Sequence, residues 1–211
     1  MTLQVVNLGL PKSGTTTLAK ALRLAGYAVA DHRLRGRNTD DRAQKGMLVA
    51  DLLYRGYFET GDPARHLPGI NAVSEMSVLR GAKSLWPQMD FALLLAIRKF
   101  HPEVRFLASR RDAFELSQSM LAWSDLGLKR LPDSVIPGLP QGYGDTTKQR
   151  MQWVEGHYAA LARFFADDPN FLEFDIADPD ARSRISVFLG RDLPWWGHLN
   201  ANPIRERLGS N

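Results

Sequence analysis

A strand, a glycine-containing loop and a helix follow one another over residues 3–26, and this segment constrains the fold most strongly. LQVVNL (3–8) is a short apolar run that ends at a glycine, which is typical of a buried strand. From Thr15 onward, apolar residues recur at helical spacing until Gly26, a favourable residue just beyond a helix C-terminus. A second apolar run over 27–31 follows. This order of elements predicts an α/β domain with a parallel sheet.

The loop between this strand and helix departs in one place from the usual nucleotide-binding loop. Gly9 and Gly14 have the familiar separation of four residues, but Thr15 stands where a nucleoside triphosphatase has its lysine. The only lysine of the loop, Lys12, lies inside it. Backbone N–H groups and the partial positive charge of the helix N-terminus attract an anion to such a loop. We therefore expect an anion site to which Lys12, Ser13, Gly14, Thr15, Thr16 and Thr17 contribute.

The rest of the chain continues the alternation of strands and helices. A Pro- and Gly-rich stretch at 131–145 is too long for a tight connection, and we expect it to be a mobile loop that helps to bind substrate. No repeat or domain boundary is visible, so residues 1–211 are predicted to form one α/β domain. The pattern predicts further strands at 70–76, 104–109 and 170–176, and helices at 40–58, 89–100, 113–124, 146–165 and 179–189.

Composition excludes several classes of function. The chain has no cysteine, which rules out disulfides, thiol catalysis and cysteine-based metal sites. Its net charge of +4 is too small and too scattered to indicate nucleic-acid binding. The longest apolar run, 91–97, is far shorter than the roughly 20 residues that span a bilayer. Because the first residues also lack the pattern of a signal peptide, we expect a soluble, cytoplasmic protein without a membrane span.

The loop sequence LPKSGTTTL resembles the 5′-phosphosulfate loop of the sulfotransferases, whose usual form is Pro-Lys-Ser-Gly-Thr-Thr. These enzymes move a sulfuryl group from 3′-phosphoadenosine 5′-phosphosulfate (PAPS) to a hydroxyl or amine and release adenosine 3′,5′-bisphosphate. The resemblance implies a three-layer α/β/α, P-loop NTPase-like fold with a mainly parallel central sheet. It also implies that Pro11 opens the donor-binding loop, that Lys12 stabilises the leaving group, and that Ser13 to Thr17 hold the 5′-phosphate. Thr17 stands where the family frequently has tryptophan.

A second motif of the same family matches at 104–119. In VRFLASRRDAFELSQS, Arg111 is followed by Asp112 and, eight residues later, by Ser119. The resemblance implies that Arg111 and Ser119 bind the 3′-phosphate of PAPS, a role suited to the forked guanidinium. Arg110 and Ser117 are the neighbouring alternatives. Ala113 stands where the family usually has proline.

The C-terminal run from Phe171 to Asn200 is similar to the tail of a small bacterial sulfotransferase-like group, and His198 and Asn200 fit its pattern, although their roles are not assigned. The family resemblance implies no metal cofactor, since a sulfuryl group carries less charge than a phosphoryl group and a lysine with backbone donors can stabilise it. The acceptor is expected to be a small molecule, a glycan or a lipid.

Transfer to a hydroxyl requires a base near Lys12. Glu75, in an otherwise uncharged stretch, is the first candidate, because partial burial would raise its pKa. His32, with Asp31 beside it, is the second. Two other functions stay open on the sequence: a non-catalytic member of the fold that binds a nucleotide or a partner protein, and, less favoured, a P-loop kinase with an altered loop.

Overall fold

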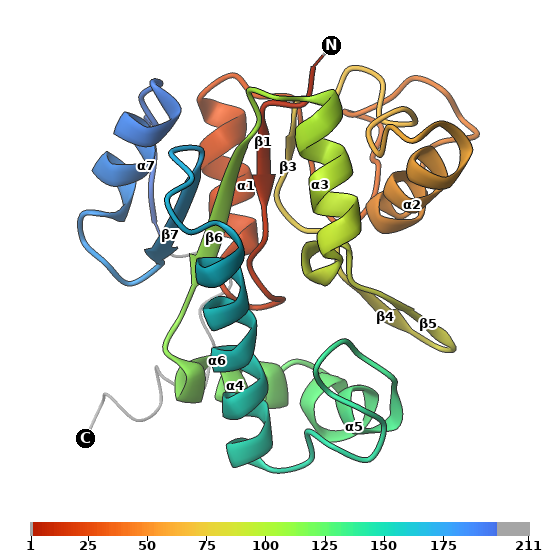
Figure 1. Cartoon of the computed structure of the whole chain (residues 1–211), viewed down its shortest axis with the longest axis vertical. Coiled ribbons are helices and arrows are strands. Elements are labelled where there is room, and N and C mark those ends of the chain that lie inside the picture. The colour runs from red at the N-terminus through yellow and green to blue at the C-terminus, as the bar shows by residue number, and fades with distance from the viewer. Residues whose placement is uncertain (1, 198–211) are drawn as a thin grey trace.

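In the computed structural model, which describes residues 2–197, five parallel strands form the central sheet in the order β2-β3-β1-β6-β7 (Figure 1). Strand β1, from the predicted strand-loop-helix segment, lies in the middle of the sheet. The strands are short, so their carboxyl ends form a compact edge. They are β1 (Val5–Asn7), β2 (Val29–Ala30), β3 (Ala72–Val73), β6 (Arg105–Arg110) and β7 (Phe171–Asp175).

Helices cover both faces of the sheet. Successive residues of a strand point to opposite faces: Val5 and Leu107 pack with one set of helices, and Val6 and Phe106 pack with another. The first set is α1 (Thr15–Leu24) and α7 (Ala181–Leu189). The second is α2 (Val49–Thr60), α3 (Phe91–Phe100), α4 (Ala113–Leu121) and α6 (Thr147–Phe164). The predicted α/β fold with a mostly parallel sheet is confirmed, and the layers are compatible with an α/β/α arrangement.

A smaller group of elements lies beyond the carboxyl ends of the strands (Figure 1). It consists of the hairpin β4 (Val78–Arg80) and β5 (Lys83–Leu85), the 3-10 turn η1 (Pro87–Met89), the π-helical turn η2 (Leu126–Arg130) and the short helix α5 (Leu131–Asp133). Two hydrogen bonds join the hairpin to the η2–α5 region. Arg130 Nη1 donates to Leu79 O at 3.0 Å, and Ser84 Oγ donates to Val135 O at 2.7 Å.

Two predictions of secondary structure need correction, and two elements were not predicted. The helix expected at 40–58 begins only at Val49, because the residues before it form a loop in which Gly46 has a φ of +88° and donates its N–H to Leu34 O. The strand expected at 70–76 is two residues long. The hairpin β4–β5 and the turn η2 were not predicted, since neither has a distinctive periodicity.

The stretch 131–145 contains α5 and is tied to α6 by side chains. The guanidinium of Arg150 is buried, and its Nη1 donates to the carbonyls of Gly144 and Asp145. Trp153 Nε1 donates to Pro137 O at 2.9 Å. The mobility expected for this stretch stays a prediction. Within the described residues, no helix combines the length and apolar character that a membrane span needs.

Candidate functional site

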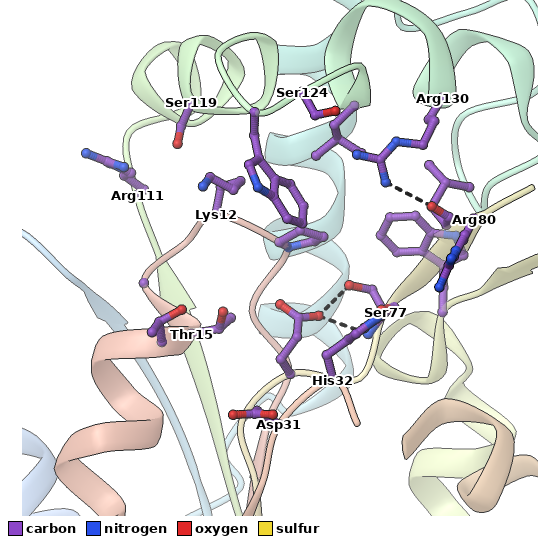
Figure 2. Close-up of a pocket in the computed structure, with 18 of the residues that line it drawn as sticks. Lys12, Thr15, Asp31, His32, Ser77, Arg80, Arg111, Ser119, Ser124 and Arg130 are labelled. Carbon is purple, nitrogen blue, oxygen red and sulfur yellow. Dashed lines mark hydrogen bonds between the residues drawn. The ribbon is translucent and has the colours of Figure 1, made fainter. Parts of the chain in front are cut away.

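A cavity of about 1030 Å³ lies at the carboxyl edge of the sheet, and a segment that follows each of the five strands lines it (Figure 2). Ligand sites in open parallel sheets are usual at this edge, where the loops leave the strands. After β1 comes the loop with Lys12, after β2 His32, after β3 Glu75, after β6 Arg111 and after β7 Ile176. Residues far apart in the sequence are thereby brought around one space.

Asn7, at the end of β1, fixes the position where the loop begins. Its side-chain amide donates to Ser74 O and to Ser109 Oγ, both at 3.0 Å, and its Oδ1 accepts the N–H of Ser109. One buried amide thus joins β1 to the ends of β3 and β6. Next to it, Gly9 has no room for a side chain, because a Cβ would overlap Ser109 and Ser13.

Gly14 is the residue at which the loop becomes helix α1. Its φ of +93° belongs to the left-handed region, and a Cβ on it would overlap the side chain of Ile176. Because α1 starts directly after it, the first N–H groups of the helix at Thr15, Thr16 and Thr17 have no acceptor within the helix. All three threonines line the cavity.

Lys12 also has a left-handed backbone, with φ +74°, which is unusual for a residue with a side chain. Its ammonium lies 4.9 Å from the ring centroid of Trp123, within range of a cation–π contact. Within residues 2–197, no carboxylate lies at ion-pair distance from it. Burial, and secondarily the charge of Arg111, lower the pKa of Lys12. Among the described residues, the charge of Lys12 is therefore not balanced by a carboxylate.

Ser13 is the predicted loop residue that does not face the cavity. Its hydroxyl is fully buried 2.8 Å from Ser109 Oγ, and its N–H donates to Leu10 O. Ser13 thus stabilises the loop from its buried side, which faces away from the cavity. The other predicted members of the loop line the cavity: Pro11, Lys12, Gly14, Thr15, Thr16 and Thr17.

Arg111 and Arg110 are consecutive residues, but their side chains have different surroundings. Arg111 lines the cavity, with its Nε 3.4 Å from Glu115 Oε2 (Figure 2). Arg110 is paired with Glu173 at 2.6 Å and with Glu155 at 3.1 Å, and it does not line the cavity. Consecutive residues at a strand end point in opposite directions, so only one of the two arginines reaches the site.

The two candidate serines of α4 also differ in their surroundings. Ser119 lines the cavity, whereas Ser117 is fully buried and accepts a hydrogen bond from Arg150 Nε at 2.9 Å. Asp112, between Arg111 and α4, has a ψ of 133°, which lies in the range that a residue before proline prefers. The backbone therefore keeps this shape with Ala113 in the proline position.

Glu75 and His32 both form hydrogen bonds with Ser77, which the sequence did not single out. Figure 2 shows His32 beside Ser77. Glu75 Oε1 accepts hydrogen bonds from the N–H of Ser77, at 2.9 Å, and from its hydroxyl. Burial raises the pKa of Glu75, and the hydrogen bonds from Ser77 oppose this effect. Both Glu75 and His32 line the cavity.

His32 is held in one tautomer by the same serine. Its Nδ1 lies 3.1 Å from Ser77 O, and because a carbonyl can only accept, Nδ1 carries the proton. Burial lowers the pKa of His32, so the ring is held neutral and its Nε2 has a free lone pair. Asp31, in contrast, forms ion pairs with Arg23, Arg35 and Arg37. These pairs leave Asp31 less suited than Glu75 or His32 to accept a proton.

Other cavity residues were missed because nothing in their local sequence marks them. They are Arg80, Lys129 and Arg130; the aromatic residues Trp86 and Trp123 line the cavity as well. His198 and Asn200 lie outside the described residues. Among residues 2–197, no group of three or more His, Cys, Asp or Glu side chains is placed to hold a metal ion.

Comparisons with known proteins add no identification. The sequence matches no family model and none of the curated proteins.

Proposed function

We propose that this protein is a PAPS-dependent sulfotransferase with the P-loop NTPase-like sulfotransferase fold, which transfers a sulfuryl group to a hydroxyl or amine. The observation that carries the proposal is a shared cavity. Lys12 and the N-terminus of α1 line it together with Arg111 and Ser119, which come from the other motif about a hundred residues later. The two motifs thus provide two anion-binding groups facing one space, as a donor with separate phosphosulfate and phosphate groups requires.

The residues present fit such a donor. The left-handed Gly14 lets the backbone approach a 5′-phosphosulfate closely, and the free N–H groups at the start of α1 suit its oxygens. Lys12 has no carboxylate partner among the described residues, so its charge is available to the leaving group. Arg111 and Ser119 supply a guanidinium and a hydroxyl for the 3′-phosphate.

The chain's own residues account for the charge and the proton of the reaction. The bond between sulfur and the bridging phosphate oxygen breaks as the acceptor oxygen bonds to sulfur. Lys12 stabilises the negative charge left on the phosphate. Glu75, with His32 as the alternative, takes the proton of the acceptor hydroxyl, since both side chains line the cavity. Burial lowers the pKa of His32 and so favours an unprotonated Nε2, whereas Glu75 acts as the base once the pH exceeds its raised pKa.

Calorimetric titration with adenosine 3′,5′-bisphosphate in the presence of EDTA tests this proposal. We expect binding without Mg²⁺ and a preference over adenosine 5′-monophosphate. Arg111→Ala removes a charged hydrogen bond worth about 1.5–3 kcal/mol and should weaken binding roughly 10- to 100-fold. Arg110→Ala is the matched control and should leave the affinity unchanged, because Arg110 is committed to Glu173 and Glu155.

Two results would contradict the proposal. One is equal affinity for the monophosphate and the bisphosphate, which would leave Arg111 without a 3′-phosphate to bind. The other is Mg²⁺-dependent binding of ATP or GTP with no preference for a 3′-phosphate, which would instead favour a P-loop kinase.

A further inference from the structure

The cavity contains more positive charge than a donor nucleotide needs. Lys12 and Arg111 belong to the donor end. Five further cations line the same cavity, and none comes from the two motifs: Arg33, Arg35, Arg80, Lys129 and Arg130. They come from the loop after β2, from the hairpin β4–β5 and from η2.

Three of these cations, Arg80, Lys129 and Arg130, belong to the hairpin and η2, at the end of the cavity opposite the donor motifs. Figure 2 shows Arg80 and Arg130 across the cavity from Arg111 and Ser119, with Lys12 nearer the donor side. The hydrogen bond from Arg130 to Leu79 O keeps the guanidinium beside the residue that precedes Arg80. We call the region around these cations the distal end. It is built from elements separate from those that bind the donor.

The carboxylates at the distal end do not balance its cations. Asp125 and Asp133 line it, two carboxylates against the three cations Arg80, Lys129 and Arg130. Asp125 pairs with Arg130. Throughout residues 2–197, no carboxylate lies at ion-pair distance from Arg80 or Lys129. The distal end therefore has a net positive charge to offer a ligand.

Apolar and aromatic surface lies beside these charges. The ring of Trp123 is 48% exposed and has Lys12 at 4.9 Å and Arg130 at 5.5 Å from its centroid. Leu79 and Trp86 also line the cavity. A flat or apolar molecular body can lie against this surface while its anionic group reaches the cations, since such surfaces favour burial of apolar area.

On the basis of the proposed function, we propose that the acceptor is itself an anion. It has an aromatic or apolar body against Trp123, a carboxylate, phosphate or sulfate group at the distal end near Arg80 and Lys129, and a hydroxyl directed toward Glu75 and Lys12. Neutral lipids and cationic amines lack the group that these cations would bind. Charge complementarity at the distal end thus selects among the acceptor classes that the fold allows.

A pair of fluorescent probes that differ in one charged group tests this proposal. The probes are 8-anilinonaphthalene-1-sulfonate and its uncharged analogue N-phenyl-1-naphthylamine, titrated with adenosine 3′,5′-bisphosphate at saturation so that the donor end is occupied. We expect the sulfonate to bind at least about tenfold more tightly. Arg80→Ala and Lys129→Ala should each reduce its affinity about three- to tenfold and leave the affinity of the neutral probe unchanged.

Arg163→Ala is the matched control, because Arg163 is an exposed arginine of α6 outside the cavity and its removal changes the net charge by the same amount. Failure of the sulfonate to bind, equal affinity for the two probes, or a preference that survives in both Arg80→Ala and Lys129→Ala would overturn the proposal.

The two proposals fail separately. A protein that binds the bisphosphate but shows no charge preference for the probes loses only the anionic acceptor. A protein that binds the sulfonate through Arg80 but does not bind the bisphosphate loses the proposed function and keeps only an anion-binding site at the distal end.

Discussion

Ser77 connects the two candidate bases through three of its atoms. Its N–H and hydroxyl donate to Glu75, and its carbonyl accepts the Nδ1 proton of His32. The donated bonds favour the charged carboxylate, whereas burial favours the neutral acid, and burial has the larger effect on the pKa of Glu75. A single serine therefore influences the pH at which Glu75 becomes a base.

The pH dependence of turnover tests this role. A carboxyl must lose its proton before it can accept one, so the release of bisphosphate from PAPS should rise with pH through the raised pKa of Glu75. Ser77→Ala removes the hydroxyl hydrogen bond that lowers this pKa and keeps the bond from the backbone N–H, so the rising limb should move to higher pH. Glu75→Gln should lower kcat by about 10²- to 10⁴-fold while the bisphosphate still binds. A rising limb that does not move in Ser77→Ala, together with normal turnover in Glu75→Gln, would assign the base to another residue.

Helix α4 is the element that sets the spacing of Arg111 and Ser119, the proposed site of the 3′-phosphate. Arg111 lies just before it and Ser119 within it, so the start of the helix fixes how the two side chains face each other. Asp112 Oδ1 accepts the N–H of Glu115 at 3.0 Å and caps this start. From the other side, Arg150 of α6 holds α4 through Ser117.

Removal of the cap should therefore affect both stability and binding. We expect Asp112→Ala to lower the free energy of unfolding by about 1 kcal/mol, the usual value of an N-cap. Bisphosphate affinity should fall as well, because the first turn of α4 frays. Asp112→Asn keeps a capping oxygen and should retain most of both quantities. Urea unfolding and calorimetry measure them. An unchanged affinity in Asp112→Ala would show that the cap does not position Arg111.

At the scale of the whole molecule, α6 joins the outer layer of helices to the loop that follows β1. His157 Nε2 donates to Leu8 O at 2.9 Å, and the hydroxyl of Tyr158 donates to Ser109 O at 2.7 Å. Both side chains are buried. Helix α6 thus fixes the backbone at the ends of β1 and β6, beside the cavity, and also packs in the hydrophobic core.

The burial of His157 should make the fold sensitive to acid. Burial lowers its pKa to about 4, against an ordinary value of 6.5. Between these values the unfolded chain binds a proton that the folded protein excludes, so stability falls as the pH decreases from 6.5 to 4. Linkage gives a loss of about 2–3 kcal/mol from this residue. His157→Gln, which keeps a donor for Leu8 O, should lose less stability than the wild type when urea unfolding at pH 7 and pH 4.5 is compared. An equal loss in both proteins would contradict this assignment.

The features that could be predicted are those that depend on residues close together in the sequence. The strand, loop and helix around Lys12 follow from local spacing, and so does the strand before Arg111. The direction of each side chain depends on tertiary structure. Ser13 counts as a hydroxyl donor in the sequence, yet in the fold it bonds to Ser109 beneath the loop. The distal end could not be predicted, because the β4–β5 hairpin and η2 lack a distinctive pattern and meet only in three dimensions.

Three features of Lys12 are unfavourable for the free energy of folding: its left-handed backbone, the partial burial of its charge and the nearby charge of Arg111. Glycine at this position would relieve all of them, since it adopts such a φ without steric cost. For stability alone, glycine would therefore be more favourable than lysine at position 12. A bound anion would offset the two electrostatic costs, the burial of the Lys12 charge and its repulsion by Arg111, and would thereby stabilise the folded state. Binding of the proposed donor should therefore raise the free energy of unfolding.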